Sequence, residues 1–169
     1  MLAVLIMALA ISGCTSPTPT VTPTLEPSVT PTPEPSGPAV LTVDGKVNTP
    51  LNLSLSDLKG YTQYNAAWVN TAGNGSYNGT GPKLLDILNK TSLQSGAINV
   101  TFFASDSFNN TMTLADLNGK YNDTIVAWEW TGVDRNNVNL TNVNNTLQLI
   151  VPGGSTKNQV KLLVQITVS

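Results

Sequence analysis

The proline-rich stretch between residues 15 and 38 is the feature that most limits what this chain can fold into. It reads TSPTPTVTPTLEPSVTPTPEPSGP. Each proline fixes φ and removes a backbone donor, so the stretch forms neither a regular helix nor an interior strand. Extended as polyproline II at about 3.1 Å per residue, it would span about 70 Å. We therefore expect an N-terminal segment over 1–14, a disordered stalk over 15–38 and one folded domain over 39–169.

The segment before the stalk has the pattern of an export signal. Residues 2–11 read LAVLIMALAI, which is too short to span a bilayer but typical of a signal-peptide h-region. Residues 11–14, ISGC, resemble the lipobox of lipoproteins, in which the cysteine is lipidated and becomes the mature N-terminus. We expect lipidation at Cys14. The alternative is an ordinary signal peptide or a short membrane anchor, with a buried or incidental Cys. One departure from the signal-peptide pattern is that no basic residue precedes the apolar run.

Composition excludes several kinds of chemistry. The chain has no His and one Cys, which excludes Ser-His-Asp and Cys-His nucleophile systems, His-containing metal sites and an intramolecular disulfide. A formal net charge of −2 argues against nucleic acid as a partner, since binding it needs a basic face. Charged residues are 11% of the chain, against about 25% in a typical domain. Asn, Thr, Ser and Gly replace them, as expected for an exported protein with a neutral surface.

The domain over 39–169 is predicted to be a strand-rich α+β fold, a mixed sheet with few short helices. The apolar runs predict strands over 39–43, 66–69, 98–105, 110–114, 125–130, 147–151 and 160–168. Asp44-Gly45 predicts a type I′ turn, and 82–90 predicts a helix with a wide apolar face. The glycine-rich 73–81 fits no phosphate-loop spacing and is predicted to be a surface loop.

One phrase occurs twice, as LSLSDLKG over 53–60 and MTLADLNG over 112–119. Each copy predicts a strand end, a hydroxyl cap, one helical turn and a glycine stop. We interpret the repeat as a recurrent turn rather than as a duplicated functional site.

Three tryptophans carry two possible roles. Trp128 and Trp130 are two residues apart in a predicted strand, so we expect their side chains to share one face. Together with Trp68 they could form an aromatic platform for a glycan. Core packing is the interpretation we favour, because three tryptophans are a large part of a small core.

Asparagine occurs repeatedly in Asn-x-Ser/Thr, the acceptor pattern for N-glycosylation. As a set, these sequons favour a glycosylated surface protein. Asn99 is set aside because it falls in a predicted strand. The remaining candidates are Asn52, Asn74, Asn78, Asn89, Asn109, Asn122, Asn139 and Asn144.

A series of short phrases resembles, in the same order, the molybdopterin-binding domain of the sulfite oxidase family over about residues 40–169. The phrases lie at 41–47, 53–59, 71–75, 81–88, 103–106, 113–117, 125–129, 149–153, 160–163 and 166–168. The resemblance implies a strand-rich α+β fold and two-electron chemistry at molybdenum. In that family the metal is held by the pterin dithiolene and by one Cys, in a phrase close to Cys-Ala-Gly-Asn.

This chain departs from the family where the metal would bind. The matching phrase is Thr71-Ala72-Gly73-Asn74, so a neutral hydroxyl stands where the family has a soft thiolate. The resemblance still implies a cleft, and we take as its candidate residues Thr71, Gly73, Asn74, Ser76, Lys83 and Lys161. We expect no metal and no cofactor; molybdopterin would be the cofactor only if the protein retains that function.

These observations predict a lipid-anchored protein on the extracytoplasmic face of the membrane, with no catalytic residues. We expect a binding or envelope module whose partners are the membrane, through its lipid, and a neutral polar ligand or an envelope protein. One alternative is a molybdopterin-dependent oxidoreductase or cofactor-binding subunit. Another is a purely structural envelope component with no ligand site.

Overall fold

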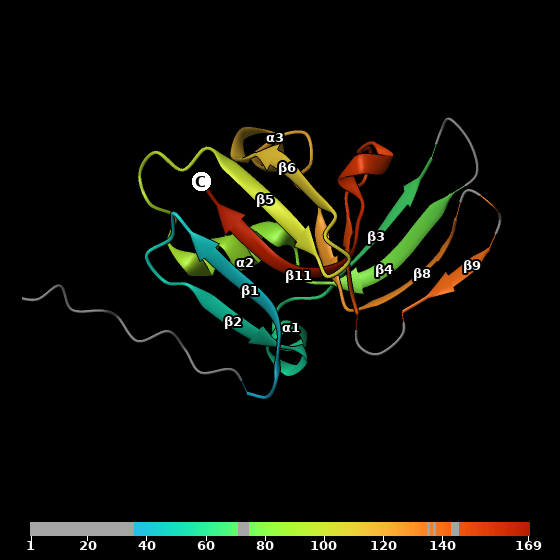
Figure 1. Cartoon of the computed structure of the whole chain (residues 1–169), viewed down its shortest axis with the longest axis horizontal. Helices are drawn as coiled ribbons and strands as arrows, with labels where there is room; N and C mark the ends of the chain where they lie inside the picture. Colours follow the sequence, from blue (N-terminus) through green and yellow to red (C-terminus); the bar gives the residue numbers. More distant parts are fainter. Residues whose placement is uncertain (1–35, 71–74, 135, 137, 143–145) are drawn as a thin grey trace, which may run out of the picture.

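Eleven strands and three short helices form the part of the chain that the computed structural model describes, residues 36–70, 75–134, 136, 138–142 and 146–169. A seven-stranded mixed sheet contains β1 (Ala39–Gly45), β2 (Leu51–Ser54), β5 (Asn99–Ala104), β6 (Asn109–Thr113), β7 (Ile125–Ala127), β10 (Leu147–Ile150) and β11 (Val160–Val168). An antiparallel sheet beside it contains β3 (Tyr64–Val69), β4 (Ser76–Gly81), β8 (Glu129–Val133) and β9 (Asn139–Thr141) (Figure 1). The helices are α1 (Leu55–Gly60), α2 (Leu84–Thr91) and α3 (Leu114–Asn118), with a 3₁₀ turn, η1 (Thr156–Asn158). The predicted strand-rich α+β fold is confirmed.

Strand β11 organises the larger sheet. Its second half lies between β1, which is parallel to it, and β5, which is antiparallel. Its first half pairs with β10, which in turn pairs with β7. The apolar run of β11 is what such a central position requires, and Leu163, Ile166 and Val168 are all buried.

The buried side chains form two clusters. The larger cluster packs the seven-stranded sheet against α2, which contributes Leu84, Ile87 and Leu88. The smaller cluster lies between the two sheets, where β7 and β10 contact the four-stranded sheet. Trp68 and Tyr77 stack there with ring centroids 5.5 Å apart, and Trp130 meets Tyr77 edge-on at 6.2 Å. These aromatic contacts join the sheets.

The prediction of a surface loop over 73–81 is wrong from Ser76 onward, because this stretch is β4. The glycines serve close packing against β7. A Cβ at Gly79 would lie 2.8 Å from the Cβ of Ala127, and one at Gly81 would lie 2.0 Å from the carbonyl oxygen of Val126. A strand can approach its neighbour this closely only without side chains.

The predicted strand over 125–130 is two strands that belong to different sheets. The chain leaves the larger sheet after β7 and enters the smaller one at β8, with Trp128 between them. The indole of Trp130 is buried in the smaller cluster, whereas that of Trp128 is half-buried and donates to Gln63 Oε1 at 2.7 Å. The expectation that Trp128 and Trp130 share a strand face is therefore wrong.

The predicted type I′ turn at Asp44-Gly45 is also wrong. Both residues stay in β1 and pair with the end of β11, and the chain reaches β2 only after five more residues. Gly45 has a φ of 90°, but Asp44 does not adopt the positive φ that the turn requires. Both copies of the repeated phrase form the predicted capped helical turn, as α1 and α3.

Candidate functional site

Among the residues that the family resemblance suggested for a cofactor cleft, the structure separates Lys83 from Ser76 and Lys161. Thr71, Gly73 and Asn74 lie outside the described residues. Ser76 begins β4, and the ammonium of Lys161 lies near this end, 5.7 Å from the ring centroid of the neighbouring Tyr77.

Lys83 lies beyond the other end of β4, at the N-cap of α2. Its ammonium forms an ion pair with Asp123 at 2.9 Å and lies 5.0 Å from the ring centroid of Tyr64. The hydrogen bond to Asp123 raises the pKa of Lys83. Lys83 and Lys161 therefore do not converge on one phosphate-sized site.

The side chains available do not fit a molybdenum centre. The chain's one cysteine is Cys14, ahead of the folded domain and outside the described residues. Within the described ranges, no three His, Cys, Asp or Glu side chains form a group that could hold a metal ion. Gln148 is fully buried and its Oε1 has no hydrogen-bond partner, and its register partner on β11 is Lys161. One amide acceptor can serve an organic ligand, but it does not replace a thiolate on the metal.

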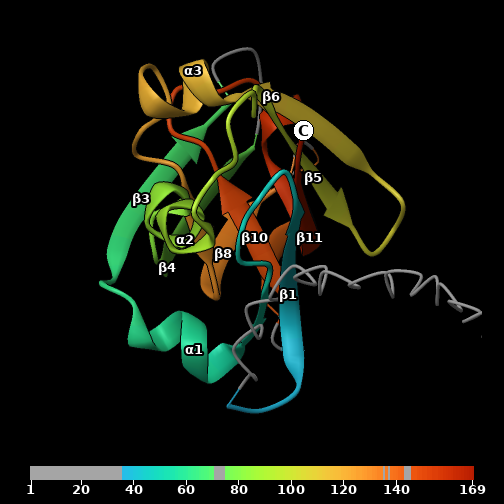
Figure 2. The ribbon, with the colours of Figure 1, turned by 90° about the vertical axis from the view of Figure 1, so that its left-hand side faces the viewer.

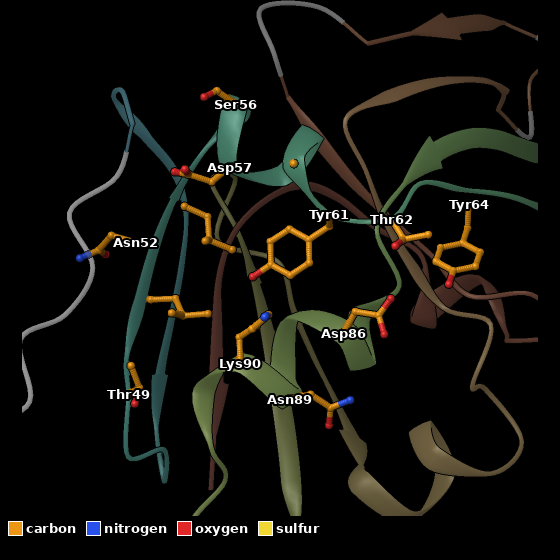
Figure 3. Close-up of a pocket in the computed structure, with 13 residues that line it drawn as sticks. Thr49, Asn52, Ser56, Asp57, Tyr61, Thr62, Tyr64, Asp86, Asn89 and Lys90 are labelled. Carbon is orange, nitrogen blue, oxygen red and sulfur yellow. The ribbon is translucent and has the colours of Figure 1, made fainter.

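A cleft lined mainly by polar residues lies elsewhere, between α1 and α2 (Figure 3). Its volume is about 870 Å³. The described cofactor-cleft candidates, Ser76, Lys83 and Lys161, do not line it. We call it the α1/α2 cleft, and it is lined by Thr49, Leu51, Asn52, Leu53, Ser56, Asp57, Gly60, Tyr61, Thr62, Tyr64, Asp86, Asn89 and Lys90.

Helix α2 forms one wall because its two faces differ in polarity. Leu84, Ile87 and Leu88 are buried in the larger core. Asp86, Asn89 and Lys90 line the cleft. They are three and four positions apart, which places them on one face of a helix. Burial of the apolar face therefore fixes which polar side chains reach the cleft.

The opposite wall follows α1 and is held by Gln63. The Nε2 of Gln63 donates to the carbonyl oxygens of Leu58, Lys59 and Tyr61, at 3.0, 3.3 and 2.6 Å. Its Oε1 accepts the indole hydrogen bond of Trp128. The half-buried amide of Gln63 thus links the segment that carries Tyr61 to Trp128, where the chain passes from one sheet to the other.

Charge in the cleft comes from Asp57, Asp86 and Lys90. Hydrogen bonds from the Ser36 and Ser54 side chains lower the pKa of Asp57 to about 2. Burial raises the pKa of Tyr61, and the charges of Asp57 and Asp86 add to that shift, so its hydroxyl stays protonated. Among the described residues, the side chains of Asp86 and Lys90 have no ion-pair or hydrogen-bond partner. Figure 3 shows the hydroxyl of Tyr61 and the ammonium of Lys90 directed toward each other.

Sequence reasoning did not find this cleft. The usable signal was the polar face of 82–90, where Asp86, Asn89 and Lys90 recur at helical spacing. Tyr61 and Tyr64 gave no signal, because nothing in a single sequence shows that the segment after α1 faces α2.

The predicted sequons are exposed wherever the structure describes them. Those asparagines are Asn52, Asn78, Asn89, Asn109, Asn122 and Asn139. Asn74 and Asn144 lie outside the described residues. Asn52 and Asn89 line the α1/α2 cleft, and glycosylation at all of these positions stays a prediction.

No helix in the described ranges is long and apolar enough to span a bilayer.

Comparison with known proteins agrees with the predicted family. The crystal structure of the sulfane dehydrogenase SoxCD from Paracoccus pantotrophus matches with a TM-score of 0.57 and 15% identity. The match covers 76% of this chain but only 37% of that chain, and at this identity it shows a shared fold alone. No curated protein sequence matches. The model of the oxidoreductase molybdopterin binding domain matches residues 30–169, which is most of the chain. This protein therefore belongs to the oxidoreductase molybdopterin-binding domain family.

Proposed function

We propose that this protein is a lipid-anchored binding or envelope module that keeps the family fold without its redox centre. One observation carries the proposal: no cysteine occurs in the family domain over 30–169, so no thiolate is available to ligate the metal. Thr71 occupies the position that resembles the family's ligand. The separation of Lys83 from Lys161 supports the same conclusion, because an anionic pterin phosphate needs basic groups close together.

The N-terminal sequence supports attachment to the extracytoplasmic face of the membrane. A lipid on Cys14 would contribute about 0.8 kcal/mol for each buried CH₂. The proline-rich stalk would then hold the domain away from the bilayer. The neutral, amide-rich surface and the exposed sequons suit such a position.

The decisive experiment measures cofactor content. The full chain is purified from its native membrane, and molybdenum is quantified by metal mass spectrometry and pterin by the fluorescence of its oxidised form. We expect both at background. Near-stoichiometric molybdenum would overturn the proposal, because the metal would then bind without a protein thiolate.

The anchor is tested separately with Cys14→Ser. We expect the wild-type chain in the membrane fraction, with a lipid-modified N-terminal residue in its mass spectrum. The variant should lose the lipid mass. An unmodified Cys14 in the wild-type chain would contradict the anchor while leaving the conclusion about molybdenum intact.

A cofactor-binding subunit is the second candidate, and the unpaired Oε1 of buried Gln148 favours it. This acceptor lies beside Lys161 in the sheet and could receive a hydrogen bond from an organic ring. The cofactor measurement distinguishes the candidates, because pterin found without molybdenum would support this one.

A further inference from the structure

We propose that the α1/α2 cleft binds a neutral saccharide. The inference rests on the proposed role as a binding module and names its ligand class. A cleft of about 870 Å³ falls in the range of about 300–1,000 Å³ that is common for ligand sites.

The cleft offers the two kinds of surface that a sugar ring needs. Leu51 and Leu53 are buried and line the cleft, and the half-buried ring of Tyr61 adds an aromatic face. Hydroxyl and amide groups surround this apolar part, including those of Thr62 and Asn89. A sugar ring likewise has an apolar C–H face and an edge of hydroxyls. The cleft therefore matches a polyol better than a purely apolar ligand.

The charges in the cleft favour a neutral ligand. Asp57 and Asp86 are both carboxylates, so they repel phosphates and uronic acids. Lys90 stands one helical turn from Asp86 and opposes a cationic ligand. A neutral hydroxylated ligand is not repelled by either sign, and it can donate to Asp86 and accept from Lys90.

The polar side chains on α2 are free to bind a ligand, and the segment that carries Tyr61 is held in place. The side chains of Asp86, Asn89 and Lys90 make no hydrogen bond with another described residue. The backbone of Tyr61 is fixed by Gln63, which is itself held by Trp128. Prior fixation of the walls reduces the entropy lost when a ligand binds.

A proline-rich peptide is a less favourable occupant. Ser36, at the end of the stalk, bonds to Asp57 at 2.6 Å on the cleft rim, so the stalk ends close to this site. Proline-rich segments, however, bind grooves lined by several aromatic faces. Here the ammonium of Lys83 already lies over the ring of Tyr64, which leaves Tyr61 as the principal aromatic surface.

The test uses the full chain, produced in a host without N-glycosylation so that Asn52 and Asn89 carry no glycan. It is kept in a detergent without a sugar headgroup. Binding is screened on an array of neutral and anionic oligosaccharides and then measured by calorimetry. We expect neutral oligosaccharides to bind. No binding of neutral oligosaccharides at about 10 mM, or a preference for anionic glycans, would overturn the proposal.

Variants locate the site. Tyr61→Ala should weaken binding at least about tenfold, whereas Tyr61→Phe keeps the ring and should lose only a few-fold. Tyr121→Ala is the matched control, because Tyr121 is another half-buried tyrosine at the edge of the same core and outside the cleft. Equal effects of Tyr61→Ala and Tyr121→Ala would contradict binding in this cleft.

A second variant guards against loss of folding. Asn89 and Lys90 are exposed on α2, so Asn89→Ala with Lys90→Ala should leave the unfolding midpoint nearly unchanged and still weaken binding. Unchanged binding would overturn the proposal. So would a peptide of residues 15–35 that binds when neutral saccharides do not. Failure here leaves the cofactor result unaffected, so the two proposals fail independently.

Discussion

The two copies of the repeated phrase have the same local structure and lie on opposite sides of the domain (Figures 1 and 2). Each forms a strand end, a hydroxyl N-cap and a short helix, as α1 and α3. Leu58 and Leu117, which occupy equivalent positions, are both completely buried. Figure 2 shows α3 at one end and α1 at the other. Similar local sequences thus form the same capped turn, but they do not determine where in the domain the turn lies or what surrounds it.

The two turns differ in what surrounds them. At α1, Ser54 and Asp57 form a complete capping box, and Ser36 adds a hydrogen bond from the start of the described chain. At α3, the Thr113 side chain accepts from the Asp116 N–H, at 3.0 Å. The α1 turn, whose cap makes the additional hydrogen bonds, forms a wall of the α1/α2 cleft. The following substitutions test this difference, from the largest expected effect to the smallest.

Truncation of the buried leucines should lower the free energy of unfolding more than any other substitution in this series. Leu58→Ala and Leu117→Ala should each lower the free energy of unfolding by about 3 kcal/mol, because each leaves a cavity in the same core. Urea unfolding of both variants measures this. A difference above about 1.5 kcal/mol would mean that the two turns are not equivalently anchored.

Loss of the Gln63 side chain, just after α1, should cause the second-largest loss of stability. Gln63→Ala removes bonds to three carbonyl oxygens and leaves the Trp128 indole without its partner, so we expect about 2 kcal/mol of destabilisation.

Asn118→Ala is the control at α3, where the amide donates to one carbonyl oxygen, that of Leu114. It should cost about 0.5 kcal/mol, because Asn118 is exposed. Thermal unfolding compares the two variants. An equal loss would refute the idea that Gln63 holds the cleft wall.

Removal of the N-caps should have a smaller effect. Ser54→Ala should cost about 1.5 kcal/mol, because this hydroxyl is buried and belongs to a capping box. Thr113→Ala should cost about 1 kcal/mol, since the Thr113 hydroxyl makes the same two bonds with Asp116 but is less buried than that of Ser54. Chemical denaturation at neutral pH measures both. The reverse order would show that the contacts around α1 add nothing to its cap.

The pH dependence of Asp57 should be the smallest effect. Its folded pKa of about 2 lies below the ordinary value of 3.8, so its contribution is complete above about pH 4 and is lost as pH falls toward 2. We expect about 1 kcal/mol over this window, because water screens the partly exposed carboxylate.

Asp57→Asn should flatten the stability profile between pH 4 and pH 2, and Asp116→Asn serves as the comparison at α3. Stability is followed by urea unfolding at each pH. An unchanged profile in Asp57→Asn would assign the acid sensitivity to other carboxylates.

Local patterns were sufficient wherever neighbouring residues decide the structure. The caps of α1 and α3, the helix near 82–90 and the long apolar β11 all follow from side-chain type and spacing. Family membership followed from the order of phrases. These features depend on backbone preference and hydrophobic period, which a single sequence records directly.

Local patterns failed where two distant segments meet. The glycine-rich 76–81 is a strand because Gly79 and Gly81 allow contact with Ala127 and Val126, which lie 48 and 45 residues further along the chain. The run 125–130 divides into two strands because its first part pairs in the seven-stranded sheet and its last part in the four-stranded sheet. Neither outcome is recorded in the local spacing of apolar residues.

By itself, the sequence determined the strand-rich class and the absence of a domain cysteine, because composition and hydrophobic period do not depend on tertiary contacts. Only the tertiary structure decided that Lys83 and Lys161 lie at opposite ends of β4, and that Tyr61 faces α2. The physical reason is that a site is made by side chains from separate elements. Their meeting is set by how the buried faces of those elements pack together.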